Sequence, residues 1–437
     1  MIIFSKIYTK LSNSDIGRRM ATGAIWSFTG TAAAKVIVLI SSIICAHFLT
    51  QTQYGEYGIV RSTISMFVIF GEAGLGLTAT KYISEYKATH KSRIPSIYYI
   101  TTYFAIITGV IVTTIVLILS GYISSNLLNA PHLKTSIMLG SIMLFLAIQN
   151  GAQIGVLSGF EDFKAIAKNT FCGSLFESVF MLIGAYYYDV VGAVLGYGLG
   201  FIVLYLLNQN SINRTFKNNN IIKSRNQIFR GDYKLLYTFS IPAALSSFLV
   251  APTYWILKTM LANSSGFEEV ALFEAADQWR IIILFIPSAI SQIVLPILSS
   301  FVKTNNERFW KVLLWNVFLN AGITAVIAIV IILFSKSIMG IYGNSYNDNL
   351  ILVYLAISAI FSSIANVVGL SISSRAKMWE GFAFNMLWAS IILGLGYIFI
   401  QNEWGAQGIA LAITFSYMVH TLLQLFYLYY IKRHQNV

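Results

Sequence analysis

The chain has 437 residues, of which 57% are hydrophobic and only 11% are charged. A soluble globular domain is nearer one quarter charged, so this composition excludes an ordinary soluble enzyme and indicates a polytopic membrane protein. The formal net charge is +12, but the basic residues lie in short loops between apolar runs rather than on one folded face. We therefore expect no nucleic-acid partner and interpret the charge as a sign of membrane topology.

The first segment, residues 1–21, is predicted to be a short cytoplasmic arm that ends in Arg18 and Arg19. It has no cleavable signal pattern, because the apolar run that follows is too long for a signal core. Twelve apolar runs then have the length of membrane-spanning helices. Their ranges are 22–49, 55–83, 95–120, 133–157, 169–188, 190–210, 236–262, 270–298, 310–335, 349–373, 380–401 and 405–430.

The loops between these runs alternate in charge. One set holds 23 of the 29 basic residues, while the opposite set holds only Lys134 and Lys336. Under the positive-inside rule this asymmetry predicts an all-α protein of about twelve spans with both termini in the cytoplasm. No loop is longer than about 25 residues, which leaves no room for a soluble catalytic domain.

The longest loop is the basic, asparagine-rich segment 211–235, which we interpret as a cytoplasmic linker. It divides the chain into two predicted lobes of six helices each, residues 22–210 and 236–431, followed by a cytoplasmic tail at 432–437. The lobes show a weak repeat, because the first two helices of each contain one basic residue apiece. Two repeated lobes with a substrate site between them are a common transporter plan.

Several motifs resemble those of a known family. AHFLTQTQYGEYGIVRSTI and FGEAGLGLTATKYISEYK resemble the helix 1–2 region of bacterial polysaccharide (O-antigen repeat-unit) flippases, and GVLSGFEDFKAIAKN resembles their helix 4–5 loop. SGFEEVALFEAADQWR and IPSAISQIVLPILSSF resemble the start of their second lobe. These flippases belong to the multidrug/oligosaccharidyl-lipid/polysaccharide exporter superfamily.

The resemblance implies a two-lobed fold, alternating access and a location in the bacterial inner membrane. It also implies a cargo, an oligosaccharide on undecaprenyl diphosphate that moves from the cytoplasmic to the periplasmic leaflet. Lipid-linked oligosaccharide, membrane lipid and the polysaccharide polymerase machinery would be its partners, and a monomer is expected.

Charged residues at membrane depth are the candidate site, because they are costly there and usually face a wet cavity. A diphosphate linker is anionic, so cations in such a cavity would offset its desolvation. The candidates for a cationic cavity are Lys35, Arg61, Arg280 and Lys258.

Each candidate has a structural alternative. Lys35 could pair with an acid on another helix, and Arg280 with an acid one turn away. Arg61 and Lys258 could snorkel to the surface, which is the interpretation the sequence favours for Lys258. The acids at membrane depth could carry a coupling ion or proton, or serve as pairing partners: Glu72, Glu177, Glu274 and Asp277. Three amides of the fourth helix could contact sugar hydroxyls or bond to neighbouring helices: Gln149, Asn150 and Gln153.

No glycine-rich loop has the spacing of a phosphate-binding ATPase motif, and we expect no cofactor, no metal and no enzymatic activity. Three rival functions stay open. A drug/cation antiporter would share the fold, and a peptidoglycan-precursor flippase would use similar cations. A membrane-embedded glycan polymerase would be expected to carry a large outer loop, which this sequence does not contain.

Overall fold

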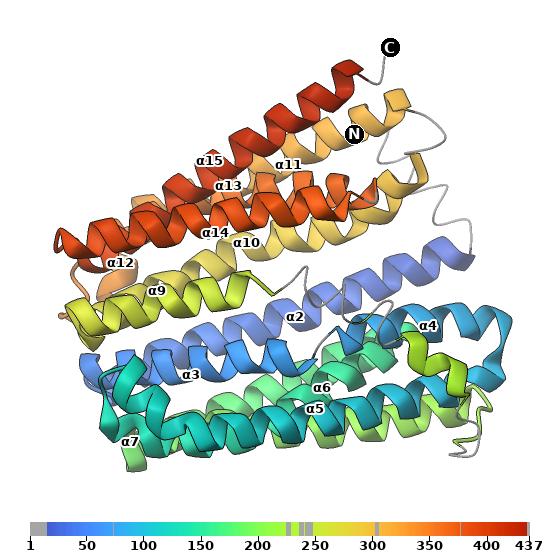
Figure 1. The fold of residues 1–437 in the computed structure, drawn as a ribbon, viewed down its shortest axis with the longest axis horizontal. Helices are drawn as coiled ribbons and strands as arrows, with labels where there is room; N and C mark the ends of the chain where they lie inside the picture. Colours follow the sequence, from blue (N-terminus) through green and yellow to red (C-terminus); the bar gives the residue numbers. More distant parts are fainter. Residues whose placement is uncertain are drawn as a thin grey trace. The chain divides into compact units, whose positions relative to one another are not determined.

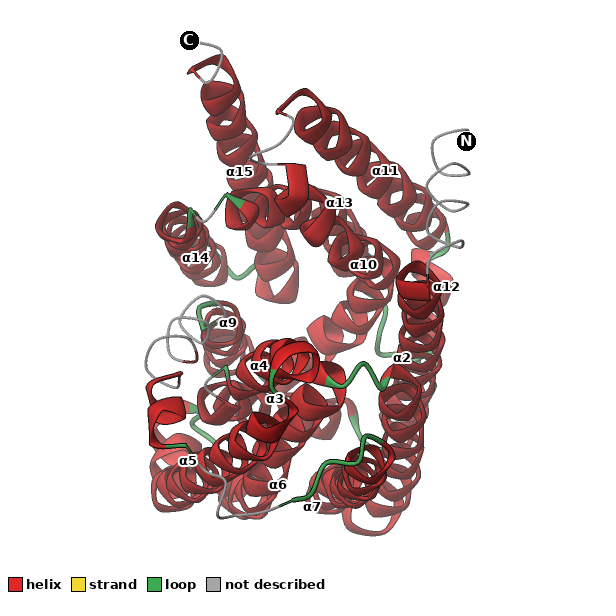
Figure 2. Cartoon of the chain, turned by 90° about the vertical axis from the view of Figure 1, so that its right-hand side faces the viewer, coloured by secondary structure: helices red, strands yellow, loops and turns green. Residues whose placement is uncertain are grey.

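The computed structural model describes residues 15–72, 74–223, 229–235, 240, 248–301, 306–375 and 377–434. Within these ranges the chain is helical and contains no strand (Figure 2), as the predicted all-α class requires. Figure 1 colours the chain from blue at the amino terminus to red at the carboxyl terminus. In this order the α-helices are α2 (Asp15–Phe48), α3 (Gln51–Glu72), α4 (Leu75–Thr89), α5 (Ile94–Tyr122), α6 (Lys134–Gly159), α7 (Phe163–Asn218), α9 (Val250–Ser265), α10 (Phe267–Phe301), α11 (Asn306–Leu333), α12 (Ser335–Gly340), α13 (Leu350–Ser374), α14 (Met378–Gln401) and α15 (Gly405–His434). Short turns lie between them: η1 (Lys91–Arg93), η2 (Ile123–Leu127), η3 (Pro131–Leu133) and η5 (Arg230–Tyr233).

Described helices coincide with most of the predicted spans, and residues 236–239 and 241–247 of the seventh predicted run lie outside the described residues. Eight helices of the described chain are long and apolar enough to cross a membrane, and the bent pair of α3 and α4 makes a ninth. The 56 residues of α7 contain a break at Tyr188 and Asp189, which separates the two predicted helices 169–188 and 190–210. The helix α9 overlaps the second half of the seventh predicted run and extends to Ser265, and α10 contains the whole eighth run. The chain is therefore an all-α polytopic membrane protein, and the side on which its termini lie stays a prediction.

Three boundaries differ from expectation. The predicted helix 55–83 is broken, because Gly74 has the left-handed φ of 71° and α4 starts a new direction 42° from α3. The arm expected at 1–21 is helical from Asp15 onward. The linker expected at 211–235 starts later, because α7 runs to Asn218 and buries Ile212 and Phe216 one turn apart.

The chain divides into two compact units. The first contains residues 1–41, 67–120 and 135–245, and the second contains 42–66, 121–134 and 246–437. The second unit thus includes two segments of the amino-terminal half. The lobe boundaries expected from the sequence stay a prediction.

Small residues bring the helices of the first unit close together. A β-carbon on Gly155 of α6 would lie 2.3 Å from the backbone oxygen of Gly76 on α4, so the two backbones touch. Close backbone approach is how membrane helices gain packing energy without a hydrophobic driving force. At one end of this unit an apolar cluster packs α4, α5, α6 and α7 together, with Ile83, Phe160 and Phe216 among its buried members.

In the second unit, α13 packs against α10, α11 and α15, and α14 packs against α15 and α9. A buried cluster that includes Phe309, Val368 and Leu428 joins α10, α11, α13 and α15. These contacts hold α10 and α9, the helices that contain Lys258, Glu274, Asp277 and Arg280.

Candidate functional site

Lys258 and Glu274 form a buried ion pair in the second unit. The Nζ atom of Lys258 on α9 donates to Oε1 of Glu274 on α10 at 2.5 Å, and it also lies 5.7 Å from the centre of the Phe273 ring. The two residues are 8% and 3% exposed. The sequence favoured a snorkelling Lys258, but its position opposite a buried carboxylate holds the ammonium inside the protein instead.

Arg280 and Asp277 form a second buried pair on α10. The Nε atom of Arg280 donates to Oδ1 of Asp277 at 2.6 Å, one turn earlier on the same helix. The guanidinium also lies 5.0 Å from the centre of the Tyr254 ring on α9. Pairing with an acid one turn away was the structural alternative predicted for Arg280, and it is the arrangement observed. Lys258 on α9 and Arg280 on α10 therefore each have a carboxylate partner.

Lys35 differs from these two residues. It lies near the middle of α2 and is half-buried, and within the described part of the chain it makes no hydrogen bond or salt bridge. Arg61 is also half-buried, on α3 in the second unit. An ammonium at membrane depth that lacks a carboxylate partner needs water or an anion beside it.

The acids of the first unit lie against glycines of neighbouring helices. A β-carbon on Gly151 of α6 would lie 2.2 Å from Oε1 of Glu72, and one on Gly200 would lie 2.4 Å from the β-carbon of Glu177. Both acids are half-buried. The absence of a side chain at these two glycines creates the room that the acids occupy.

The three amides of α6 are buried, and two of them bond to α7. Asn150 Nδ2 donates to the carbonyl of Phe201 at 3.0 Å, and Gln153 Nε2 donates to Oε1 of Gln209 at 3.1 Å. The Nε2 atom of Gln149 has no hydrogen-bond partner among the described atoms. These are the interhelical bonds that we predicted as the alternative to sugar contacts.

Polar contacts in the second unit join segments far apart in the sequence. Gln51 Nε2 donates to the carbonyl of Glu268 at 3.3 Å, and Thr52 Oγ1 donates to Oε1 of the same residue at 2.9 Å. Asn263 Nδ2 donates to the carbonyl of Leu127 at 2.7 Å. These contacts tie residues of the amino-terminal half to α9 and α10.

Sequence analysis missed the buried polar pair of α15. Gln424 donates through Nε2 to Nε2 of His420 at 3.1 Å, and Phe384 and Tyr417 pack their rings beside the imidazole. The signal was available, since a histidine and a glutamine four residues apart on an apolar helix share one face. Among the described residues no cluster of three histidine, cysteine or acidic side chains could hold a metal ion.

The fold of the chain is similar to that of solved transporter structures. The chain has a TM-score of 0.74 to an inward-facing conformation of a multidrug resistance MATE family transporter of the MOP superfamily, at 16% identity over 90% of this chain and 93% of that one. A MOP superfamily transporter from Pyrococcus furiosus matches with the same TM-score and identity over 96% of each chain. The protein therefore has the fold of MOP superfamily transporters.

The family match is more specific than the similarity in fold. A model described as polysaccharide biosynthesis protein matches residues 20–302, and the chain belongs to this family. The EPS I polysaccharide export inner membrane protein EpsE of Ralstonia nicotianae is 27% identical over 202 residues, which is 45% of this chain and 45% of that protein. The chain thus matches about half the length of this relative. Its long apolar helices make it a multi-pass membrane protein.

Proposed function

We propose that this protein is a flippase that moves an oligosaccharide linked to undecaprenyl diphosphate from the cytoplasmic to the periplasmic leaflet, for a surface polysaccharide such as O-antigen. The membership in the polysaccharide biosynthesis family supports the class of cargo. The residue-level observation that carries the proposal is Lys35, a half-buried cation at membrane depth without an acid partner in the described chain.

A diphosphate group would supply the negative charge that such a lysine lacks. The ammonium would form charge-assisted hydrogen bonds to phosphate oxygens, while the polyprenyl tail stays in lipid. Lys258 and Arg280 are less available, because Glu274 and Asp277 already neutralise them. Arg61 on α3 stays a second candidate cation. Of the acids, Glu72 and Glu177 are the candidates for a coupling ion or proton.

Alternating access requires contacts that can break and re-form. The hydrogen bonds of Gln51 and Thr52 to Glu268 are exposed and polar, and such bonds contribute only about 0.5–1.5 kcal/mol each. Bonds this weak can break more easily than a buried apolar core can separate, so they would suit a gate on the predicted periplasmic side.

The proposal is tested by the leaflet in which the lipid-linked oligosaccharide accumulates when the protein is depleted. A membrane-impermeant reagent that modifies sugars would find repeat units on the cytoplasmic side only. Units that reach the periplasmic leaflet but stay unjoined would favour the polymerase, and unchanged glycan with raised drug accumulation would favour the antiporter.

The role of Lys35 is tested in the same strain. Lys35→Ala is expected to impair export while membrane insertion stays normal, and Lys35→Arg to retain part of it because the charge remains. Lys336→Ala, at an exposed position of α12, is the matched control. Normal surface polysaccharide in Lys35→Ala would remove the cationic-cavity hypothesis.

A further inference from the structure

The carboxyl end of α7 turns back on itself through a left-handed residue. Asn220 has a φ of 54°, the N–H of Ile221 donates to the carbonyl of Phe216 at 3.0 Å, and the N–H of Asn220 donates to the carbonyl of Lys217 at 3.1 Å. These two bonds are those of a Schellman motif, in which asparagine can replace the usual glycine. Ile221 packs against the cluster that contains Phe216, which is the apolar contact that accompanies this motif.

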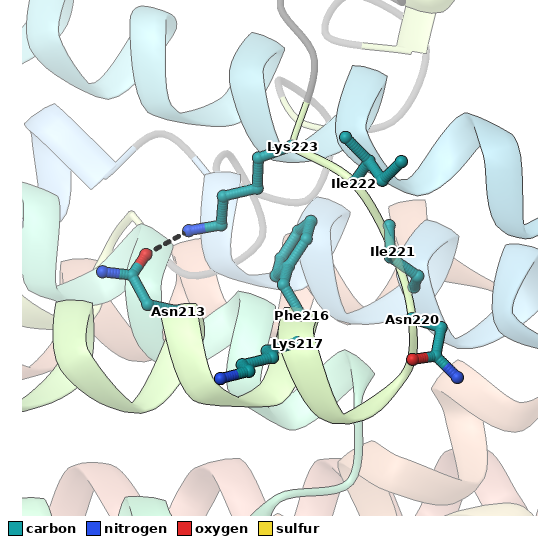
Figure 3. A pocket seen from close by; sticks show the side chains of 7 residues that line it. All are labelled: Asn213, Phe216, Lys217, Asn220, Ile221, Ile222 and Lys223. Atoms are coloured by element: carbon teal, nitrogen blue, oxygen red, sulfur yellow. Dashed lines mark hydrogen bonds between the residues drawn. The ribbon is translucent and has the colours of Figure 1, made fainter.

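The turn brings Lys223 back over the end of the helix. Its Nζ atom lies 4.6 Å from the centre of the Tyr98 ring and 4.7 Å from that of Phe216. The same atom donates to Oδ1 of Asn213 at 2.5 Å, the dashed line in Figure 3. The lysine is thus half-buried on two aromatic faces, and its hydrogen-bond partner is a neutral amide.

Lys223 lies at a pocket of about 600 Å³ in the first unit (Figure 3). The pocket is lined by Asn213, Phe216, Lys217, Asn220, Ile221, Ile222 and Lys223. Two of the seven residues are cations, two are amides and none is acidic. Burial lowers the pKa of Lys223 to about 8, which is the behaviour of an ammonium that has lost water without gaining a counter-ion.

The segment that follows is fastened to the same unit. Asp232 of η5 is 1% exposed, pairs with Arg93 and accepts from Ser96 Oγ at 2.7 Å. The backbone N–H of Phe229 donates to Ser96 Oγ at 3.0 Å. The described residues on either side of 224–228 are thus both fixed to this unit, by the turn after α7 and by the contact of η5 with the start of α5.

We propose that this pocket binds a phosphate-bearing head group at the membrane surface, with Lys223 as the main charge partner, Lys217 as a second cation of the lining and the Asn213 amide beside Lys223 as a hydrogen-bond donor. Ile222 lines the pocket and is 79% exposed. Segments at a lipid interface typically combine exposed apolar residues such as this one with neighbouring lysines. The inference goes beyond the proposed function, because it concerns one end of α7 and does not depend on what the protein transports.

The test measures binding to the purified full-length protein. Inorganic diphosphate is titrated by calorimetry, and native mass spectrometry compares the retention of phosphatidylglycerol with that of phosphatidylcholine. Lys223→Gln is expected to weaken binding of the phosphate probe about tenfold, since a charge-assisted bond is lost. Lys91→Gln removes an exposed lysine of η1 and is expected to change it less than about twofold.

A second variant protects the test against misfolding of Lys223→Gln. Asn213 is exposed on α7, and Asn213→Asp would place a carboxylate where the amide oxygen now accepts from Lys223. Lys223 would then have an internal counter-ion, and binding is expected to fall as in Lys223→Gln while the aromatic stacking stays.

The outcomes separate the two sources of phosphate. Binding of diphosphate alone means that the phosphate group suffices, and preferential retention of phosphatidylglycerol alone means that the ligand is a lipid head group. Binding of neither probe, an equal loss in Lys91→Gln and Lys223→Gln, or unchanged binding in Asn213→Asp would overturn the proposal. A failed leaflet assay would leave these results untouched, so the two proposals fail independently.

Discussion

Lys258 on α9 and Glu274 on α10 share one 2.5 Å hydrogen bond, and both side chains are at least nine-tenths buried. They lie 16 residues apart in the sequence, on two helices. This pair explains how the second unit keeps an ammonium inside the protein without exposing it to lipid.

Removal of one partner should be far more harmful than removal of both. Lys258→Met would leave Glu274 as an uncompensated buried carboxylate and is expected to lower the free energy of unfolding by about 3–5 kcal/mol. The double variant Lys258→Met/Glu274→Gln is expected to recover most of this loss. Thermal unfolding in detergent measures both, with Lys336→Met as the control, and a double variant as unstable as the single one would contradict the account.

The contact of α4 with α6 should tolerate no side chain at Gly155. Gly155→Ala would force a β-carbon to 2.3 Å from the oxygen of Gly76, and backbone cannot yield as a flexible side chain can. We expect a loss of about 1–3 kcal/mol in stability.

The matched control for this prediction is Gly322→Ala on α11. A β-carbon there would meet nothing within 4 Å, and alanine is about 0.5–1 kcal/mol better than glycine inside a helix. The control is therefore expected to be neutral or stabilising. If both variants unfolded at the same temperature, the close approach of α4 and α6 would be refuted.

Asp232 should decide whether η5 stays docked on α5. Asp232→Asn removes the charge that pairs with Arg93, a residue whose side chain is 35% exposed, so we expect a loss of about 1–3 kcal/mol rather than more. The rate of tryptic cleavage within 211–235 should rise.

Glu161→Gln is the comparison for the Asp232 variant. Glu161 accepts from Lys87 Nζ at 3.2 Å in an exposed pair, which contributes at most about 1 kcal/mol. Its cleavage rate should stay near that of the unchanged protein. Equal acceleration in both variants would mean that Asp232 has no special part in docking.

The pocket at the end of α7 should respond to pH. Lys223 titrates near 8, so its charged form predominates at pH 7 and its neutral form at pH 9. Diphosphate binding needs the charged form, and the affinity is expected to fall as the pH rises through about 8. Calorimetry at pH 7 and pH 9 measures this, and Asn213→Asp should remove the dependence. An affinity that is constant over this range would place the anion elsewhere.

Much of the fold could be predicted from local patterns. The apolar runs predicted the helices, and the boundary predicted between 169–188 and 190–210 coincides with the break inside α7. The break at Gly74 was missed, because a left-handed glycine inside an apolar run looks the same as a glycine that packs against another helix. The extension of α7 to Asn218 was missed because its basic residues were read as a loop.

The sequence by itself determined the class, the helical spans and the set of charged residues at membrane depth, because hydrophobic length and charge are properties of single segments. It also contained Lys35 as a candidate and the three-residue spacing of Asp277 and Arg280. Only the tertiary structure decided that Lys258 pairs with Glu274 and that Lys223 folds back over Phe216. The physical reason is that a charge is stabilised by whatever lies within a few ångströms, and packing between distant segments chooses those neighbours.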